Sequence, residues 1–154
     1  MDIDKFVFAG DSAGGHLTFS VAYLAMMRGF RMPDGIFSLY PAFSLDLDKF
    51  FPSSLLAGDD EILSSGFLAF CSACTIRKGG NPKTSCFVSP ILAPDAMLRH
   101  IPPTHIMVSE IDALRDQGYQ MMYRMLKNNK KVHLHHMKNF MHGWLQFDNN
   151  GFPI

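Results

Sequence analysis

The sequence predicts an α/β protein built from about four parallel strands with helices on their flanks. The period of the apolar residues alternates between that of a strand and that of a helix along the whole chain. Helices between successive strands are typical of right-handed crossovers, which join parallel strands, and we expect them to cover both faces of the sheet. The 154 residues, 47% of them hydrophobic and 18% charged, are enough for one folded unit with a core of its own. We therefore expect residues 1–154 to form a single domain.

The first half of the chain is expected to hold two strands and one helix. A short buried strand at 5–9 leads into a glycine-rich turn, and a helix follows at 15–28 with Gly29 as its stop signal. A second strand at 36–40 ends at Pro41. The helix carries four apolar residues on one face, namely Leu17, Val21, Leu24 and Ala25.

The second half is expected to hold two helices and two further strands. A loop or lid-like stretch at 43–60 precedes a helix at 61–77, which Asp59 or Asp60 could cap. Residues 79–103 are rich in proline and are expected to be irregular. The remaining elements are a third strand at 104–109, a helix at 114–128 that turns Tyr119, Met122, Met125 and Leu126 inward, and a fourth strand at 131–137.

The most informative motif is Gly10-Asp11-Ser12-Ala13-Gly14-Gly15, which directly follows the first strand. The pattern G-x-S-x-G between a strand and a helix is typical of a nucleophile elbow, which holds a serine hydroxyl clear of the backbone. Glycine suits Gly10 and Gly14 because such a turn brings backbone too close for a Cβ and strains the dihedral angles. The N–H of Ala13 is a candidate donor to an oxyanion. An ordinary Gly-Ser turn is the alternative, and the flanking strand and helix favour the elbow.

A serine hydroxyl attacks an ester only with help, so the elbow predicts a histidine to take its proton and an acid to orient that histidine. Asp112 follows the third strand and His142 follows the fourth, at the edge of the sheet where ligands bind in open α/β folds. A surface-loop histidine is the alternative for His142. Asp116 and Glu110 are alternatives to Asp112, although Arg115 and Asp116 are better explained as a local ion pair.

Further stretches carry a resemblance to a known family. They are Asp112-Ala113-Leu114-Arg115-Asp116, His142-Gly143-Trp144, Pro33-Asp34-Gly35-Ile36 with Tyr40-Pro41, and Ser89-Pro90-Ile91-Leu92-Ala93-Pro94. With the elbow, they make residues 5–147 resemble the hormone-sensitive lipase family of α/β hydrolases. The resemblance implies a serine carboxylic-ester hydrolase, an esterase or lipase, with Ser12 as nucleophile, His142 as base and Asp112 as its orienting acid. It also implies an acyl-enzyme, no cofactor or metal, and an ester or acylglycerol substrate. A cytoplasmic location, with lipid droplets as a candidate place of action, goes with it.

The chain departs from the family's pattern in ways that point to a partial α/β-hydrolase fold with the N-terminal strands missing. The family has several strands before its elbow, and its His-Gly-Gly stretch there donates N–H groups to the oxyanion; neither occurs here. His16 stands where the family usually has asparagine. The first strand would then have an unpaired edge through which the chain could self-associate. The alternative function is a truncated, catalytically impaired or non-catalytic remnant or binding protein on the same scaffold.

Composition and the remaining motifs exclude other classes of protein. Fourteen basic and fourteen acidic residues cancel, so nothing favours nucleic acid as a partner, and no apolar run is long enough for a transmembrane segment. Three cysteines cannot all pair with one another, which suits a reducing compartment, and Cys71-x-x-Cys74 lies within a predicted helix without a second metal-binding pair. His133 and His135 share one face of a strand, and we interpret them as exposed residues rather than metal ligands. His16 is expected to pack or to donate hydrogen bonds.

Overall fold

Four parallel strands form one sheet in the order β1-β2-β3-β4. The computed structural model describes residues 4–49, 51–58, 60–76 and 80–147. The strands are β1 (Val7–Asp11), β2 (Gly35–Leu39), β3 (Thr104–Ile111) and β4 (Val132–Met141), and each pairs in parallel with the next. The predicted fold class and its four parallel strands are therefore confirmed.

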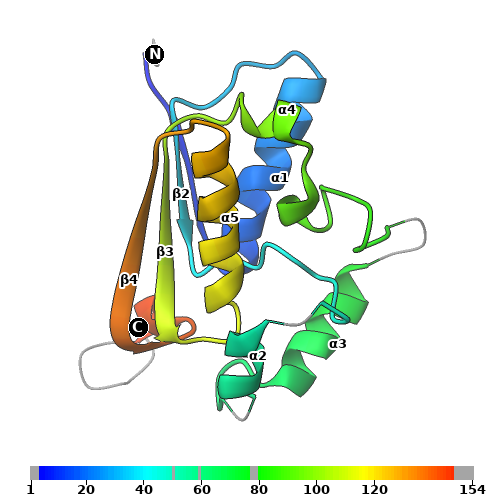
Figure 1. The fold of residues 1–154 in the computed structure, drawn as a ribbon, viewed down its shortest axis with the longest axis vertical. Coiled ribbons are helices and arrows are strands. Elements are labelled where there is room, and N and C mark those ends of the chain that lie inside the picture. Colours follow the sequence, from blue (N-terminus) through cyan, green and yellow to red (C-terminus); the bar gives the residue numbers. More distant parts are fainter. Residues whose placement is uncertain (1–3, 50, 59, 77–79, 148–154) are drawn as a thin grey trace.

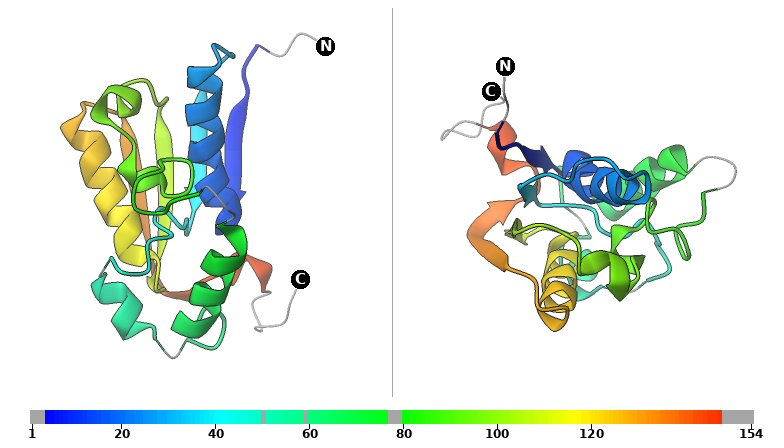
Figure 2. Two further views of the ribbon diagram at one scale, coloured as in Figure 1. Left: turned by 90° about the vertical axis from the view of Figure 1, so that its right-hand side faces the viewer. Right: turned by 90° about the horizontal axis from the view of Figure 1, so that it is seen from above.

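The helices divide into two groups by their place relative to the sheet. The long helices α1 (Ala13–Met27) and α5 (Arg115–Lys127) and the short α4 (Asp95–Leu98) lie on the same face of the sheet, whereas α2 (Pro52–Leu56) and α3 (Ser65–Thr75) lie beyond the carboxyl ends of the strands (Figures 1 and 2). Short 3₁₀ turns occupy Pro90–Leu92 and Trp144–Gln146. The carboxyl end of the sheet is thus bounded by α2 and α3, which is where the sequence places its chemistry.

The main core lies between the sheet and helices α1 and α5. Its fully buried members include Phe19, Ile36, Ile106 and Met121. Gly118 lets α5 approach β3 closely, because a Cβ at that position would lie 2.3 Å from Cγ1 of Val108. Burying each such aliphatic or aromatic side chain contributes about 1.5–3 kcal/mol, so this layer fixes the strands whose ends carry the site.

The inward faces of the two long helices differ from the prediction. Ala25 is buried as expected, but Leu17, Val21 and Leu24 are 55%, 44% and 45% exposed. The helix α1 buries Phe19 and Tyr23 in their place. The sequence could not choose a face because α1 is apolar or small nearly all round. The exposed side chains lie on the helix that follows β1, which is an edge strand of the described sheet. In α5, Met125 is buried as expected and Tyr119 and Met122 pack against the core, whereas Leu126 is exposed.

The boundaries of α3 also differ from the prediction. The helix begins at Ser65, and the side chain of Ser64 caps it by accepting a hydrogen bond from Phe67 N at 3.3 Å. Oδ1 of Asp60 accepts from Ile62 N and Leu63 N at 2.7 and 2.8 Å, so Asp60 stabilises the turn before the helix instead of capping it. Asp59, the other predicted cap, lies outside the described residues.

Other boundaries shift by a few residues. The stretch expected to be a loop at 43–60 contains α2, and the irregular stretch at 79–103 contains α4. β3 and β4 run on to Ile111 and Met141, past a register shift in their pairing. Within the described part of the chain, no helix is both long and apolar enough to cross a bilayer.

The expected helical cover on both faces is wrong for the described residues, because aromatic and imidazole rings line the sheet face opposite the helices. Phe37, His105 and His133 stack in a row, with centroid separations of 4.8 and 4.9 Å, and Nδ1 of His105 lies 2.9 Å from Nε2 of His135. His133 and His135 are exposed on one face of β4, as expected. Among the described residues, no group of three or more His, Cys, Asp or Glu side chains is arranged to hold a metal ion.

Candidate active site

Ser12 occupies a strained turn between β1 and α1. Its φ of 51° lies in the left-handed region that L-residues rarely adopt. The turn is held by two backbone hydrogen bonds, from Ser12 N to Leu39 O at 2.9 Å and from His16 N to Ser12 O at 3.0 Å. Since β1 ends at Asp11 and α1 begins at Ala13, Ser12 lies between the two elements at the carboxyl edge of the sheet.

The two glycines of the elbow have different structural requirements. A Cβ on Gly10 would lie 2.5 Å from the carbonyl carbon and oxygen of Gly14, so only glycine fits there without moving the first turn of α1. A Cβ on Gly14 would meet only Oδ1 of Asp11, at 3.9 Å, and Gly14 has no positive φ. The close approach expected at both glycines is therefore present at Gly10 and absent at Gly14.

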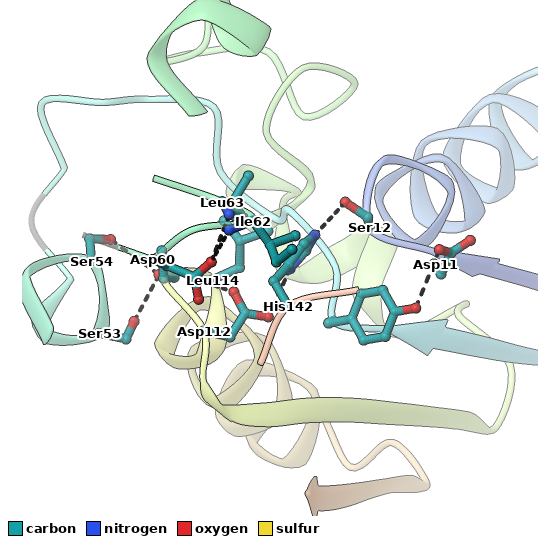
Figure 3. Close-up of polar contacts among 12 residues, drawn as sticks. Asp11, Ser12, Ser53, Ser54, Asp60, Ile62, Leu63, Asp112, Leu114 and His142 are labelled. Carbon is teal, nitrogen blue, oxygen red and sulfur yellow. Dashed lines mark hydrogen bonds and ion pairs between the residues drawn. The ribbon is translucent and has the colours of Figure 1, made fainter. Parts of the chain in front are cut away.

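Three of the predicted site residues lie in line at the carboxyl ends of the strands. Oγ of Ser12 lies 2.8 Å from Nε2 of His142, and Nδ1 of His142 lies 2.9 Å from Oδ2 of Asp112 (Figure 3). Asp112 and His142 are 1% and 5% exposed. A carboxylate only accepts hydrogen bonds, so Nδ1 of the imidazole donates to Asp112 and Nε2 is left to accept from the serine hydroxyl.

The alternatives to Asp112 have other partners. Oδ1 of Asp112 itself also accepts from Leu114 N at 2.8 Å, which fixes the carboxylate. Glu110 accepts from Asn139 N at 2.7 Å, and Asp116 pairs with Arg115 at 3.0 Å. Neither Glu110 nor Asp116 is therefore the hydrogen-bond partner of the His142 imidazole.

A cavity of about 480 Å³ opens beside Ser12 and His142, within the range of small-molecule sites. The helix α3 supplies part of its wall. Its apolar lining includes Leu17, Leu45, Leu63, Phe67, Leu68 and Leu114. Apart from Leu114, which lies in the Asp112–Asp116 stretch, no sequence motif marked these residues, because they come from α1, the loops and α3 and meet only in the folded chain.

Donors for an oxyanion come from the start of α1. The N–H of Ala13 has no acceptor within the helix, since the first four N–H groups of any helix lack one. The positive end of the helix dipole lies at the same place. Nearby, His16 is buried, with its Nδ1 and Nε2 2.8 Å from Ala42 O and 3.0 Å from Phe87 O, so it makes hydrogen bonds as expected.

Sequence reasoning missed two residues that contact the site, Tyr40 and Gln146. Tyr40 was expected to end the second strand and to belong to a stretch of the family resemblance, without a role in the site. Its ring packs against the imidazole of His142 with centroids 5.0 Å apart. Nε2 of Gln146 donates to Oδ2 of Asp11 at 3.3 Å. The Tyr-Pro pair at a strand end was the available signal, but it did not reveal which side chain the ring would meet.

Comparisons with known proteins agree with this architecture. A family model described as the α/β hydrolase fold matches residues 1–146. Hormone-sensitive lipase of Ictidomys tridecemlineatus is 44% identical over 68 residues, which are 44% of this chain and 9% of that protein. Arylacetamide deacetylase of Bos taurus is 37% identical over 59 residues, which are 38% of this chain and 15% of that protein.

A solved structure extends the likeness to nearly the whole chain. Carboxyl esterase 2 from the mycorrhizal fungus Tuber melanosporum superimposes with a TM-score of 0.79 at 28% identity, over 90% of this chain and 45% of that chain. The chain therefore spans less than half of that esterase and a small part of the two curated relatives. The four-stranded sheet described here corresponds to part of the esterase structure.

Proposed function

This chain belongs to the hormone-sensitive lipase family of α/β hydrolases, and we propose that it is the catalytic part of a serine carboxylic-ester hydrolase. The single observation that carries the proposal is the hydrogen-bonded series Ser12–His142–Asp112, with separations of 2.8 and 2.9 Å. Such a series is what activates a serine hydroxyl for acyl transfer.

The proposed reaction proceeds through an acyl-enzyme on Ser12. Oγ attacks the ester carbonyl carbon while Nε2 of His142 takes the hydroxyl proton, and the N–H of Ala13 donates to the carbonyl oxygen as it becomes an oxyanion. The imidazolium gives the proton to the departing alkoxide, and the C–O bond of the ester breaks. Water then attacks the acyl carbon with the same imidazole as base, which releases the carboxylic acid and restores Ser12. Asp112 keeps the proton of the imidazole on Nδ1 throughout.

The cavity supports an apolar acyl group as the part of the substrate that enters beside Ser12. Leucine and phenylalanine side chains form much of its wall, and burial of a hydrocarbon chain against them contributes about 0.8 kcal/mol per CH₂ group. Acylglycerols and simple carboxylic esters both present such a group next to the scissile bond. We therefore propose an uncharged ester or acylglycerol as the substrate class.

We propose that residues 1–154 act as one partial domain in the cytoplasm and that the edge of β1 supports self-association. The three cysteines are free thiols, which fits a reducing compartment. β1 pairs only with β2 within the described sheet, and the half-exposed Val21 and Leu24 lie on the helix that follows β1. Light scattering should give a mass that rises with protein concentration. A monomer at every concentration would contradict the self-association.

A non-catalytic remnant is the second candidate, and the oxyanion site is the observation that favours it. Among the elbow residues, Ala13 is the N–H donor that follows the nucleophile, and the sequence holds no His-Gly-Gly stretch to add others. Loss of one oxyanion donor costs roughly 10²–10³ in rate, about 3–4 kcal/mol. A remnant would therefore fold and bind the ester without turning it over.

Hydrolysis of p-nitrophenyl esters of increasing acyl length distinguishes the two candidates. If the chain is an ester hydrolase, we expect turnover that Ser12→Ala abolishes. Ser65→Ala, a matched change at the exposed start of α3, should leave the turnover intact. A folded chain that binds the ester but releases no p-nitrophenol above the Ser12→Ala rate would favour the remnant.

A further inference from the structure

Tyr40 occupies an unusual place at the end of β2. It follows Leu39, whose carbonyl accepts from Ser12 N, and its own N–H donates to Met107 O at 2.7 Å. Its φ is 33°, in the left-handed region where a non-glycine residue is strained, and its side chain is 1% exposed. Strain at a buried aromatic residue beside a reactive site indicates that the surrounding structure holds it there.

The ring of Tyr40 contacts the imidazole of His142 from the side. The two rings meet edge to face, with centroids 5.0 Å apart and planes at 65°. The hydrogen bonds at Nδ1 and Nε2 hold the imidazole along one line between Asp112 and Ser12. They leave the ring free to tilt about that line, and a flat ring packed against its side removes this freedom.

The hydroxyl of Tyr40 connects the same ring to the elbow. It donates to Oδ2 of Asp11 at 3.4 Å, and Nε2 of Gln146 donates to the same oxygen at 3.3 Å. Burial, followed by the nearby Asp11 carboxylate, raises the pKa of Tyr40 to about 12, so the phenol keeps its proton at neutral pH. Asp11 precedes Ser12, so the tyrosine spans from the residue beside the nucleophile to the base.

We propose that Tyr40 is a positioning residue, which holds the imidazole of His142 at the tilt needed to meet the Ser12 hydroxyl. This inference rests on the proposed ester-hydrolase function. The ring carries most of the effect, and the hydroxyl-to-Asp11 contact keeps the ring oriented. Tyr40 does not contact the reacting atoms and exchanges no proton with them.

Two variants at Tyr40 separate the ring from the hydroxyl. Edge-to-face contacts are worth about 0.5–1.5 kcal/mol, so Tyr40→Leu should lower kcat by roughly 2- to 13-fold with KM within about twofold of wild type. Tyr40→Phe keeps the ring and should stay within about twofold of wild type in kcat, since a 3.4 Å hydrogen bond is weak.

Tyr23 supplies the matched control. It is also fully buried, and its hydroxyl donates to Pro90 O at 3.3 Å, but it packs in the main core away from His142. Tyr23→Leu should lower the melting temperature at least as much as Tyr40→Leu and leave kcat of the folded fraction unchanged. If the two leucine variants lose kcat equally, the effect is general destabilisation and the inference is wrong.

A measurement without turnover keeps the inference separate from the proposed function. Carbon-13 relaxation of the His142 imidazole in the full 154-residue chain reports how freely the ring moves. We expect a rigid imidazole in wild type, Tyr40→Phe and Tyr23→Leu, and a mobile one in Tyr40→Leu. An inactive wild type with this pattern would refute the ester hydrolase and keep the positioning role. An equally rigid imidazole in Tyr40→Leu would overturn the positioning role.

Discussion

The glycine at position 10 should be indispensable, although it lies two residues from the nucleophile and contacts no substrate. A Cβ there would lie 2.5 Å from the carbonyl carbon and oxygen of Gly14. Ordinary contacts begin at 3.4 Å, so in Gly10→Ala the first turn of α1 must retreat by the difference. Backbone atoms cannot rotate away as a side chain does, and the retreat carries Ser12 with it.

The expected cost has two parts. Inserting a methyl group into a tightly packed site destabilises by about 1–3 kcal/mol, which lowers the melting temperature of a domain of this size by roughly 2–12 °C. A displacement of about 1 Å at the reacting atoms costs about 10²-fold in rate. Gly14→Ala is the control within the same turn, because its Cβ would contact only Oδ1 of Asp11, at 3.9 Å. It should be close to neutral in both respects.

Thermal unfolding and the rate of p-nitrophenyl ester hydrolysis, measured side by side on both variants, decide the matter. The structure predicts that Gly10→Ala loses stability and activity and that Gly14→Ala keeps both. Equal losses in the two variants, or a tolerated Gly10→Ala, would show that the elbow geometry described here is wrong.

Three further changes test the site and the sheet. Asp112→Asn should lower kcat by about 10⁴-fold, because the amide can favour the wrong tautomer of the imidazole, while circular dichroism stays that of the wild type; a loss below tenfold would contradict the role of Asp112. Burial first, and then the neighbouring His133 and His135, lower the pKa of His105, so the folded chain takes up a proton there less readily than the unfolded chain. The folded state is therefore more stable above about pH 6.5 and loses stability as the pH falls below that value. Between about pH 7.5 and about pH 5.5, the melting temperature of His105→Phe should depend less on pH than that of the wild type. An equal dependence in the two proteins would refute this. The pKa of Tyr40 is raised to about 12, so stability falls as the pH rises above about 10. Tyr40→Phe should therefore make urea unfolding less sensitive to alkali, and a variant as sensitive as the wild type would show that Tyr40 is not responsible.

The fold class could be read from the sequence because its strands are short apolar runs bounded by glycine and proline. The inward face of α1 could not, since Leu17 and Phe19 are equally apolar and only the tertiary structure separates the exposed one from the buried one. The start of α3 was ambiguous for a similar reason. Asp60 and Ser64 both precede apolar positions, and both are residue types that cap helices well. In the structure, Ser64 is the N-cap of α3.

The part of the site that follows from the order of the strands along the chain could be predicted from the sequence. Ser12, Asp112 and His142 each follow a strand of one parallel sheet, so their convergence at one edge follows from topology alone. The contact between Tyr40 and His142 depends on how β2 and β4 place their ends in three dimensions, and no periodicity encodes it. The catalytic roles themselves stay predictions.

Mass spectrometry of the chain after treatment with a fluorophosphonate reports whether Ser12 is an activated nucleophile, because this reagent forms a stable bond only with an activated serine. We predict one phosphonyl group per chain, located on the peptide that contains Ser12 and absent from both Ser12→Ala and His142→Ala. A folded chain that gains no adduct, or gains one on another serine, would contradict it.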